Sequence, residues 1–307
     1  MELVNPLVFP ILQILAGATA LSIVLSFIIS ILYRGEPDKV KNTWLKLWIL
    51  LGLILVLIGT GSLGKWTFLP IALFLAYWGW LELLQCIQIK YGKILNSTAI
   101  TCLGTLGILG GLLGTTFATF LGVVIAAWVA IALPMLLHRQ PASMYSVLGT
   151  AFGMIFITMP LANLLELVAN SYGEFSLLVL LVMGNDGFSQ GFGLMGGKTP
   201  LMPNISPAKT WVGTGGGFLS CLVIGYLLHF LVPGWQVWQI ILVAGVVSAV
   251  ALCGDLIASS LKREAGIKDF GTVLAVTGGI LDKFDSLLFA IPIFYFIAKY
   301  LDNNISL

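Results

Sequence analysis

The chain has 307 residues, of which 59% are hydrophobic and only 9% are charged. Its mean hydropathy is +1.03, which excludes an ordinary soluble domain because no soluble core of this size needs so many long apolar runs. The formal net charge of +2 brings no basic stripe with it, so we expect no nucleic-acid partner.

Apolar runs follow one another along the whole chain. We therefore predict an all-α, polytopic transmembrane protein with about ten spans (nine or ten) and no soluble domain. In chain order the predicted spans cover residues 8–33, 45–62, 67–88, 97–115, 117–137, 144–167, 176–196, 211–231, 236–259 and 285–300. The lower count would apply if 97–137 formed one unit, since Gly110 to Thr116 is the only break inside it.

Basic residues predict the orientation of these spans. If the N-terminus lies outside and the spans alternate, thirteen of the fifteen Lys and Arg residues fall in inside loops, and only Lys65 and Lys299 fall outside. Cytoplasmic loops of membrane proteins carry such an excess of positive charge. We therefore expect a multi-pass protein of the inner (cytoplasmic) cell membrane, with both termini outside.

Polarity is distributed unevenly along the chain. We expect residues 1–307 to form a single membrane domain, in which 1–180 is mainly scaffold and 184–286 forms an active-site region at the cytoplasmic face. Residues 254–286 alone hold five carboxylates and four cations: Asp255, Glu264, Asp269, Asp282, Asp285, Lys262, Arg263, Lys268 and Lys283. Ionised groups near lipid are costly and are usually functional.

Two acids lie near the cytoplasmic ends of predicted spans. Asp186 and Asp255 would be costly there as unpaired carboxylates, and a divalent metal would supply the missing positive charge. Carboxylate oxygens suit Mg²⁺. The alternative is a structural ion pair, or an aspartate that reaches water at a helix end.

Asp282 and Asp285 are three residues apart at the start of the last span, so they share a helix face. Gly278 and Gly279 precede them and could present backbone N–H groups to a phosphate. This pattern favours a metal–phosphate site, although acids at a helix start also complement the helix dipole.

Basic and hydroxyl side chains complete the candidate site. Lys262, Arg263 and Lys268 could hold a triphosphate, and Ser206 and Lys209 could clamp a head group. Two further acids, Glu82 and Glu166, lie in or near apolar spans, where pairing with a cation or with the interface is at least as expected as a role in the site.

These segments resemble the phosphatidate cytidylyltransferase family, the CDP-diacylglycerol synthases. The resemblance rests on Asp186, on the Ser206-Pro207, Lys209-Thr210-Trp211 and Gly254-Asp255 segments, on Ser259 to Arg263, on Lys268-Asp269, and on Gly278 to Ser286. It covers about 100 residues directly.

The resemblance implies transfer of a cytidylyl group from CTP to phosphatidic acid at a membrane, giving CDP-diacylglycerol and pyrophosphate, and it allows a homodimer. Mg²⁺ would be held by Asp186, Asp255 and Asp282, with Asp269 and Asp285 as further candidates. The catalytic set would be Asp255, Asp282, Lys262 and Arg263. The nucleotide-binding set would be Lys268, Lys209, Ser206, Gly278, Gly279 and Lys283.

Departures from the family pattern leave two alternatives open. Thr277 stands where the family has His, and Lys283 stands where it has Arg. The chain could instead be a related nucleotidyltransferase or lipid kinase that uses another lipid, such as an isoprenoid. It could also be a relative that binds lipid or CTP without catalysis.

Overall fold

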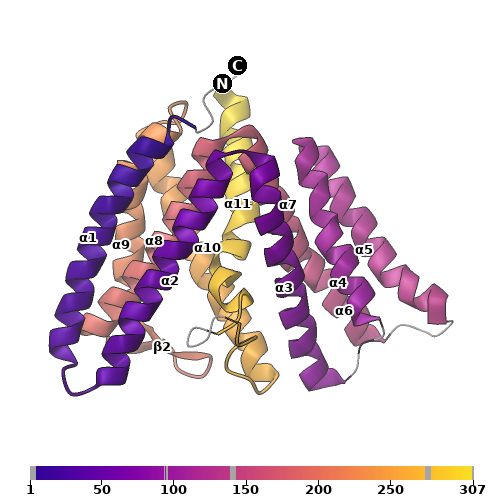
Figure 1. Cartoon of the computed structure of the whole chain (residues 1–307), viewed down its shortest axis with the longest axis horizontal. Helices are drawn as coiled ribbons and strands as arrows, with labels where there is room; N and C mark the ends of the chain where they lie inside the picture. Colours follow the sequence, from indigo (N-terminus) through magenta and orange to yellow (C-terminus); the bar gives the residue numbers. More distant parts are fainter. Residues whose placement is uncertain (1–4, 93, 95, 139–142, 274–277, 306–307) are drawn as a thin grey trace.

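The computed structural model describes residues 5–92, 94, 96–138, 143–273 and 278–305. Within these ranges the chain is a helical bundle with one small hairpin (Figure 1). The helices are α1 (Val8–Leu32), α2 (Pro37–Ser62), α3 (Lys65–Tyr91), α4 (Ser97–Leu106), α5 (Thr116–His138), α6 (Met144–Gly153), α7 (Met159–Asn170), α8 (Tyr172–Gly196), α9 (Trp211–Leu227), α10 (Val237–Glu264) and α11 (Leu281–Ile305).

The predicted membrane architecture is confirmed. Among the described residues, eight helical segments are long and apolar enough to cross a membrane, counting Met144–Asn170 as one. Two further apolar helices, Ser97–Leu113 and Trp211–Leu227, are shorter. A helix of 17 residues such as α9 is about 26 Å long, slightly less than the hydrocarbon core of a bilayer.

Short non-α turns extend or join several helices. The segment Gly107–Leu113 continues α4 as a 3₁₀-helix, and Met154–Thr158 joins α6 to α7 as a π-helical turn. A third short turn, His229–Leu231, follows α9. The predicted boundary within 97–137 is therefore real, because α5 begins separately at Thr116.

Helix α8 is the central element of the bundle. Every residue from Tyr172 to Met183 is buried, and a helix that is apolar all round belongs in an interior. Phe175 of α8 meets Phe68 of α3 edge to face, with ring centroids 5.2 Å apart. Gly61 of α2 has no side chain to obstruct Phe175, so three helices pack closely here.

A polar network connects helices on the side of the bundle opposite the hairpin. The buried Glu166 of α7 accepts hydrogen bonds from Thr119 and Tyr295, each at 2.5 Å, and lies 3.6 Å from the Lys299 ammonium. Of the alternatives left open for Glu166, the structure shows pairing with a cation. The network joins α5, α7 and α11.

A two-stranded antiparallel hairpin connects α8 to α9. Strand β1 (Pro200–Met202) pairs with β2 (Ser206–Thr210). Thr210 then caps α9, because its hydroxyl accepts the N–H of Gly213 at 3.1 Å. In Figure 1, β2 and the α10–α11 connection lie at one end of the bundle, whereas α1 begins and α11 ends at the other.

Candidate active site

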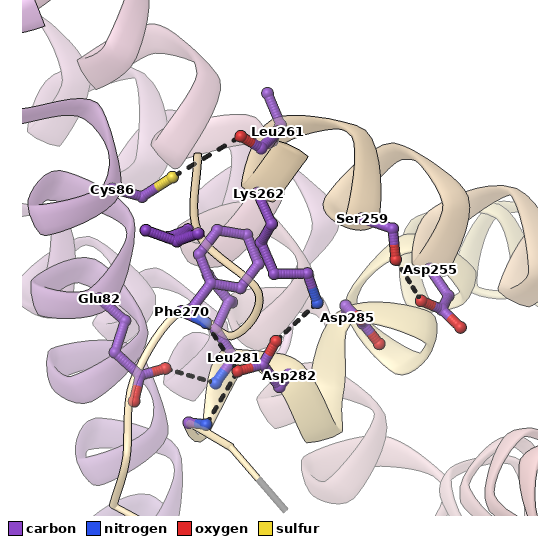
Figure 2. Close-up of polar contacts among 12 residues, drawn as sticks. Glu82, Cys86, Asp255, Ser259, Leu261, Lys262, Phe270, Leu281, Asp282 and Asp285 are labelled. Atoms are coloured by element: carbon purple, nitrogen blue, oxygen red, sulfur yellow. Dashed lines mark hydrogen bonds and ion pairs between the residues drawn. The ribbon is translucent and has the colours of Figure 1, made fainter. Parts of the chain in front are cut away.

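Asp282 organises the loop that leads into α11. One carboxylate oxygen accepts the backbone N–H groups of Phe270 and Gly279, each at 2.8 Å. The other lies 2.6 Å from the Lys262 ammonium, and both side chains are less than 10% exposed. A buried ion pair needs such additional hydrogen bonds to offset its desolvation. Asp282 therefore has both oxygens engaged by the protein (Figure 2).

Glu82 of α3 holds the first residues of α11, a role that the sequence did not reveal. Its buried carboxylate accepts the N–H of Ile280 at 3.0 Å. It also accepts the N–H of Leu281 at 2.7 Å, as Figure 2 shows. The first N–H groups of a helix have no partner within the helix, and an acid at that end also complements the helix dipole. Glu82 is therefore engaged by backbone N–H groups, not by a cation or the membrane interface.

The two glycines before α11 are required by this arrangement. Gly278 adopts a φ of +92°, in the left-handed region that other residues disfavour. A Cβ on Gly279 would lie 2.5 Å from a carboxylate oxygen of Glu82. The N–H of Gly279 is donated to Asp282, so it is used inside the protein and does not face a phosphate.

Asp255 of α10 connects to the hairpin. Its carboxylate lies 2.5 Å from the Lys209 ammonium on β2 and accepts the hydroxyl hydrogen of Ser259 at 3.1 Å. Both members of this ion pair remain about one-quarter exposed. The pair therefore places β2 beside α10 while leaving Asp255 accessible from the cavity described below.

Asp186, Asp255 and Asp285 come together from α8, α10 and α11. The three carboxylates interact electrostatically with one another. Asp285 is only 4% exposed and accepts the adjacent Ser286 N–H at 2.7 Å. Asp186 is hydrogen-bonded to Ser286 and to Asn185. The fold thus joins acids that lie up to 99 positions apart in the sequence.

A cavity of about 950 Å³ opens beside these acids. Its lining comes from α1, α2, α8, the hairpin, α9, α10 and α11. Seven of the predicted site residues contribute to it: Asp186, Ser206, Lys209, Asp255, Asp282, Lys283 and Asp285. The wall formed by α1 and α2 combines two kinds of side chain: leucines and isoleucines (Leu25, Ile29, Leu47, Ile49, Leu50 and Leu53) and polar residues (Ser22, Ser26, Lys39, Thr43 and Lys46). The cavity therefore offers both charged groups and a set of leucine and isoleucine side chains.

Other predicted residues lie outside the cavity lining. Arg263 is exposed and donates to the backbone oxygens of Ile205 at 3.2 Å and Ile267 at 3.1 Å. Lys268 and Asp269 are exposed on the loop after α10. Thr277, which stands where His was expected from the family pattern, lies outside the described residues.

The donor chemistry around Asp186 suits a divalent cation. Across the described part of the chain, no three His, Cys, Asp or Glu side chains already converge on one metal position. Lysines pair with Asp255 and Asp282, whereas Asp186 and Asp285 form no ion pair with any described residue. Mutually repelling carboxylates gain from added positive charge, and Mg²⁺ prefers oxygen ligands.

The sequence matches a family model and several known proteins. A sequence model described as the cytidylyltransferase family matches residues 41–301. The chain is 39% identical over 123 residues to a phosphatidate cytidylyltransferase of Aquifex aeolicus (39% of this chain, 46% of that protein). It is 44% identical over 103 residues to a phosphatidate cytidylyltransferase of Staphylococcus aureus (33% and 40%).

A longer match is with the uncharacterized protein YnbB of Escherichia coli, 28% identical over 184 residues (57% of this chain, 62% of that protein). The chain thus spans between 40% and 62% of the length of these relatives.

Proposed function

Because the chain belongs to the cytidylyltransferase family, we propose that it is a membrane enzyme that transfers a cytidylyl group from CTP to phosphatidic acid. An oxygen of the lipid phosphate attacks the α-phosphorus of CTP and forms a new P–O bond. The bond to the β-phosphate breaks, and pyrophosphate leaves. The products are CDP-diacylglycerol and pyrophosphate.

One observation carries this proposal: a charged acid–lysine cluster and a set of leucine and isoleucine side chains from α1 and α2 border the same cavity. A phosphorylated lipid needs both surfaces, since its head group is anionic and its acyl chains are apolar. The relatives from Aquifex aeolicus and Staphylococcus aureus are named phosphatidate cytidylyltransferases, which supports phosphatidic acid as the lipid.

The roles divide according to the contacts of each acid. Asp186, Asp255 and Asp285 would hold Mg²⁺, which when bound neutralises phosphate oxygens. Lys209 and Lys283 line the cavity and would stabilise the negative charge of the triphosphate. Lys262 and Asp282 bind each other and would position the start of α11. Phosphoryl transfer asks mainly for such positioning and charge neutralisation.

We place the site at the cytoplasmic surface of the cell membrane. The excess of Lys and Arg in the loops on that side supports this orientation, and CTP is available there. The cavity wall formed by the membrane-spanning helices α1 and α2 would admit the lipid from the bilayer.

The test is an assay of purified protein with CTP, Mg²⁺ and phosphatidic acid, in which pyrophosphate and CDP-diacylglycerol are both measured. We expect both products from the wild type and a near-complete loss with Asp255→Asn. Glu264→Gln removes a nearby exposed charge and serves as the matched control. If pyrophosphate were released only with another phosphorylated lipid, that lipid and not phosphatidic acid would be the substrate.

A second function has one observation in its favour. Lysines already neutralise Asp255 and Asp282, as expected of a relative that binds lipid or CTP without catalysis. Calorimetric titration with Mg²⁺ and CTP distinguishes the two, because binding without any turnover across a panel of lipids and nucleotides supports the non-catalytic function.

A further inference from the structure

Lys46 belongs to α2, in the half of the chain that the sequence indicates as scaffold. It lies nine residues after Pro37, the first residue of α2, which corresponds to about 14 Å along the helix. Its side chain is partly buried and lines the same cavity as Asp186 and Lys283. Neighbouring Lys41 is exposed and does not line the cavity.

Five lysines line the cavity: Lys39, Lys46, Lys198, Lys209 and Lys283. Lys209 lies 2.5 Å from Asp255 and Lys39 lies 3.7 Å from Glu36, whereas Lys198 is exposed. Lys46 and Lys283 form no ion pair or side-chain hydrogen bond within the described residues. Lys46 and Lys283 are thus the partly buried lining lysines without a carboxylate partner in the described structure, and their positive charge is available for a ligand.

The surroundings of Lys46 are themselves positive. It interacts electrostatically with Lys283 and Lys268, and with Asp269 as the opposing charge. A partly desolvated ammonium beside two others is unfavourable. An anion that contacts Lys46 and Lys283 would remove this repulsion and form charge-assisted hydrogen bonds.

The alternative is that Lys46 simply extends its ammonium to the membrane surface. A lysine of that kind covers apolar surface with its stem and places its charge in bulk water. Lys46 instead borders a cavity that also contains Lys283 and three acids able to hold a metal. Its position favours a ligand with several negative oxygens.

We propose that Lys46, together with Lys283, binds a phosphate group of a substrate, so that α2 is part of the active site. The phosphate belongs either to the nucleotide or to the lipid head group. The assignment of this phosphate to the nucleotide or to the lipid rests on the proposed function. The existence of a phosphate site at Lys46 and Lys283 does not rest on it.

The experiment compares Lys46→Met, which removes the charge, with Lys46→Arg, which keeps it. Lys41→Met is the matched control on the same helix. Three ligands are tested separately with the full-length protein: CTP and inorganic pyrophosphate by calorimetry, and phosphatidic acid by flotation with phosphatidylcholine vesicles that contain or lack it. Elution and thermal stability in detergent verify that each variant folds.

We expect Lys46→Met to weaken binding of at least one ligand by about tenfold or more, while Lys46→Arg and Lys41→Met bind nearly as the wild type does. Weakening confined to CTP and pyrophosphate identifies the nucleotide, and weakening confined to the vesicles identifies the lipid. Unchanged binding of all three ligands by Lys46→Met, or no binding by the wild type, overturns the proposal.

The same measurements separate this inference from the proposed function. If the wild type turned over its substrates and Lys46→Met had the same KM values, this inference would be contradicted and the proposed function would be supported. If pyrophosphate binding depended on Lys46 but no substrate were turned over, this inference would be supported and the proposed function would be contradicted.

Discussion

The carboxylate of Glu82 in α3 accepts the backbone N–H of Leu281 at 2.7 Å, across 199 positions of the chain. Leu281 is the first residue of α11, Asp282 follows it directly in the first turn, and Asp285 lies about one turn further along the helix. The third helix thus fixes where the eleventh begins. A substitution of Glu82 should therefore alter the positions of Asp282 and Asp285, although Glu82 does not line the cavity.

Replacing Glu82 with Gln tests this relationship. The amide keeps the size of the side chain, but only its oxygen can accept an N–H, so one donor of Ile280 or Leu281 loses its partner. We expect a loss of about 1–3 kcal/mol in stability and a higher KM for CTP. Thermal unfolding in detergent and steady-state kinetics measure these two effects.

Glu166→Gln is the control for that experiment, because Glu166 is also a buried acid but belongs to a network on the other side of the bundle. It should lower stability without changing the KM for CTP. If Glu82→Gln left the KM unchanged as well, Glu82 would have no positioning role.

Adding a methyl group at Gly279 should displace Glu82. The new Cβ would lie 2.5 Å from the Glu82 carboxylate, so the loop or α3 must shift. We expect Gly279→Ala to lower both thermal stability and turnover. Gly52→Ala in α2 adds the same group where nothing lies within 4 Å and should behave as the wild type. Equal behaviour of the two variants would refute the close packing at Gly279.

The two ion pairs should respond differently to loss of the acid. Asp282→Asn leaves the buried Lys262 without its partner, and breaking a buried pair typically costs about 3–5 kcal/mol. Asp255→Asn affects a pair that is about one-quarter exposed and should cost less stability while abolishing turnover. Unfolding and product assays on the same preparations compare the two variants.

A second substitution tests whether the unpaired lysine accounts for the lost stability of Asp282→Asn. Adding Lys262→Met to Asp282→Asn removes the stranded charge and should restore part of the lost stability. A double variant no more stable than Asp282→Asn would show that the ion pair does not account for the cost.

Removal of divalent cations should stop the reaction. A chelator is expected to abolish pyrophosphate release, and added Mg²⁺ should restore it, because the acid cluster needs positive charge before it can accept a triphosphate. Asp285→Asn should raise the Mg²⁺ concentration that gives half-maximal turnover. Asp38→Asn, at an exposed acid in the first turn of α2, is the matched control. Full activity in the chelator would contradict the metal proposal.

The membrane helices were predictable because apolar runs of this length have few other uses. The spans predicted at 97–115 and 211–231 correspond to helices, but each is shorter than the full-length spans. Where these helices end depends on local features such as the Thr210 cap and on the 3₁₀ extension of α4. Hydropathy alone does not encode these features.

The candidate site was predictable in its acids but not in their pairing. Asp186 and Asp255 lie in the C-terminal parts of α8 and α10, and Asp285 lies near the start of α11. They meet because these helix ends lie on the same side of the bundle. Which lysine reaches which acid depends on helix rotation, which sequence spacing does not define. Glu82 was missed because its partners are backbone N–H groups, and these leave no trace in the pattern of side chains.

Arg263 attaches the hairpin through a main-chain carbonyl, that of Ile205, and not through any side chain there. Every amino acid supplies that oxygen, so the tether is indifferent to the identity of residue 205. The turn between β1 and β2 is free to mutate while its anchorage persists. Substitutions in this turn would therefore leave in place the β2 residues that line the cavity, from Ser206 to Thr210.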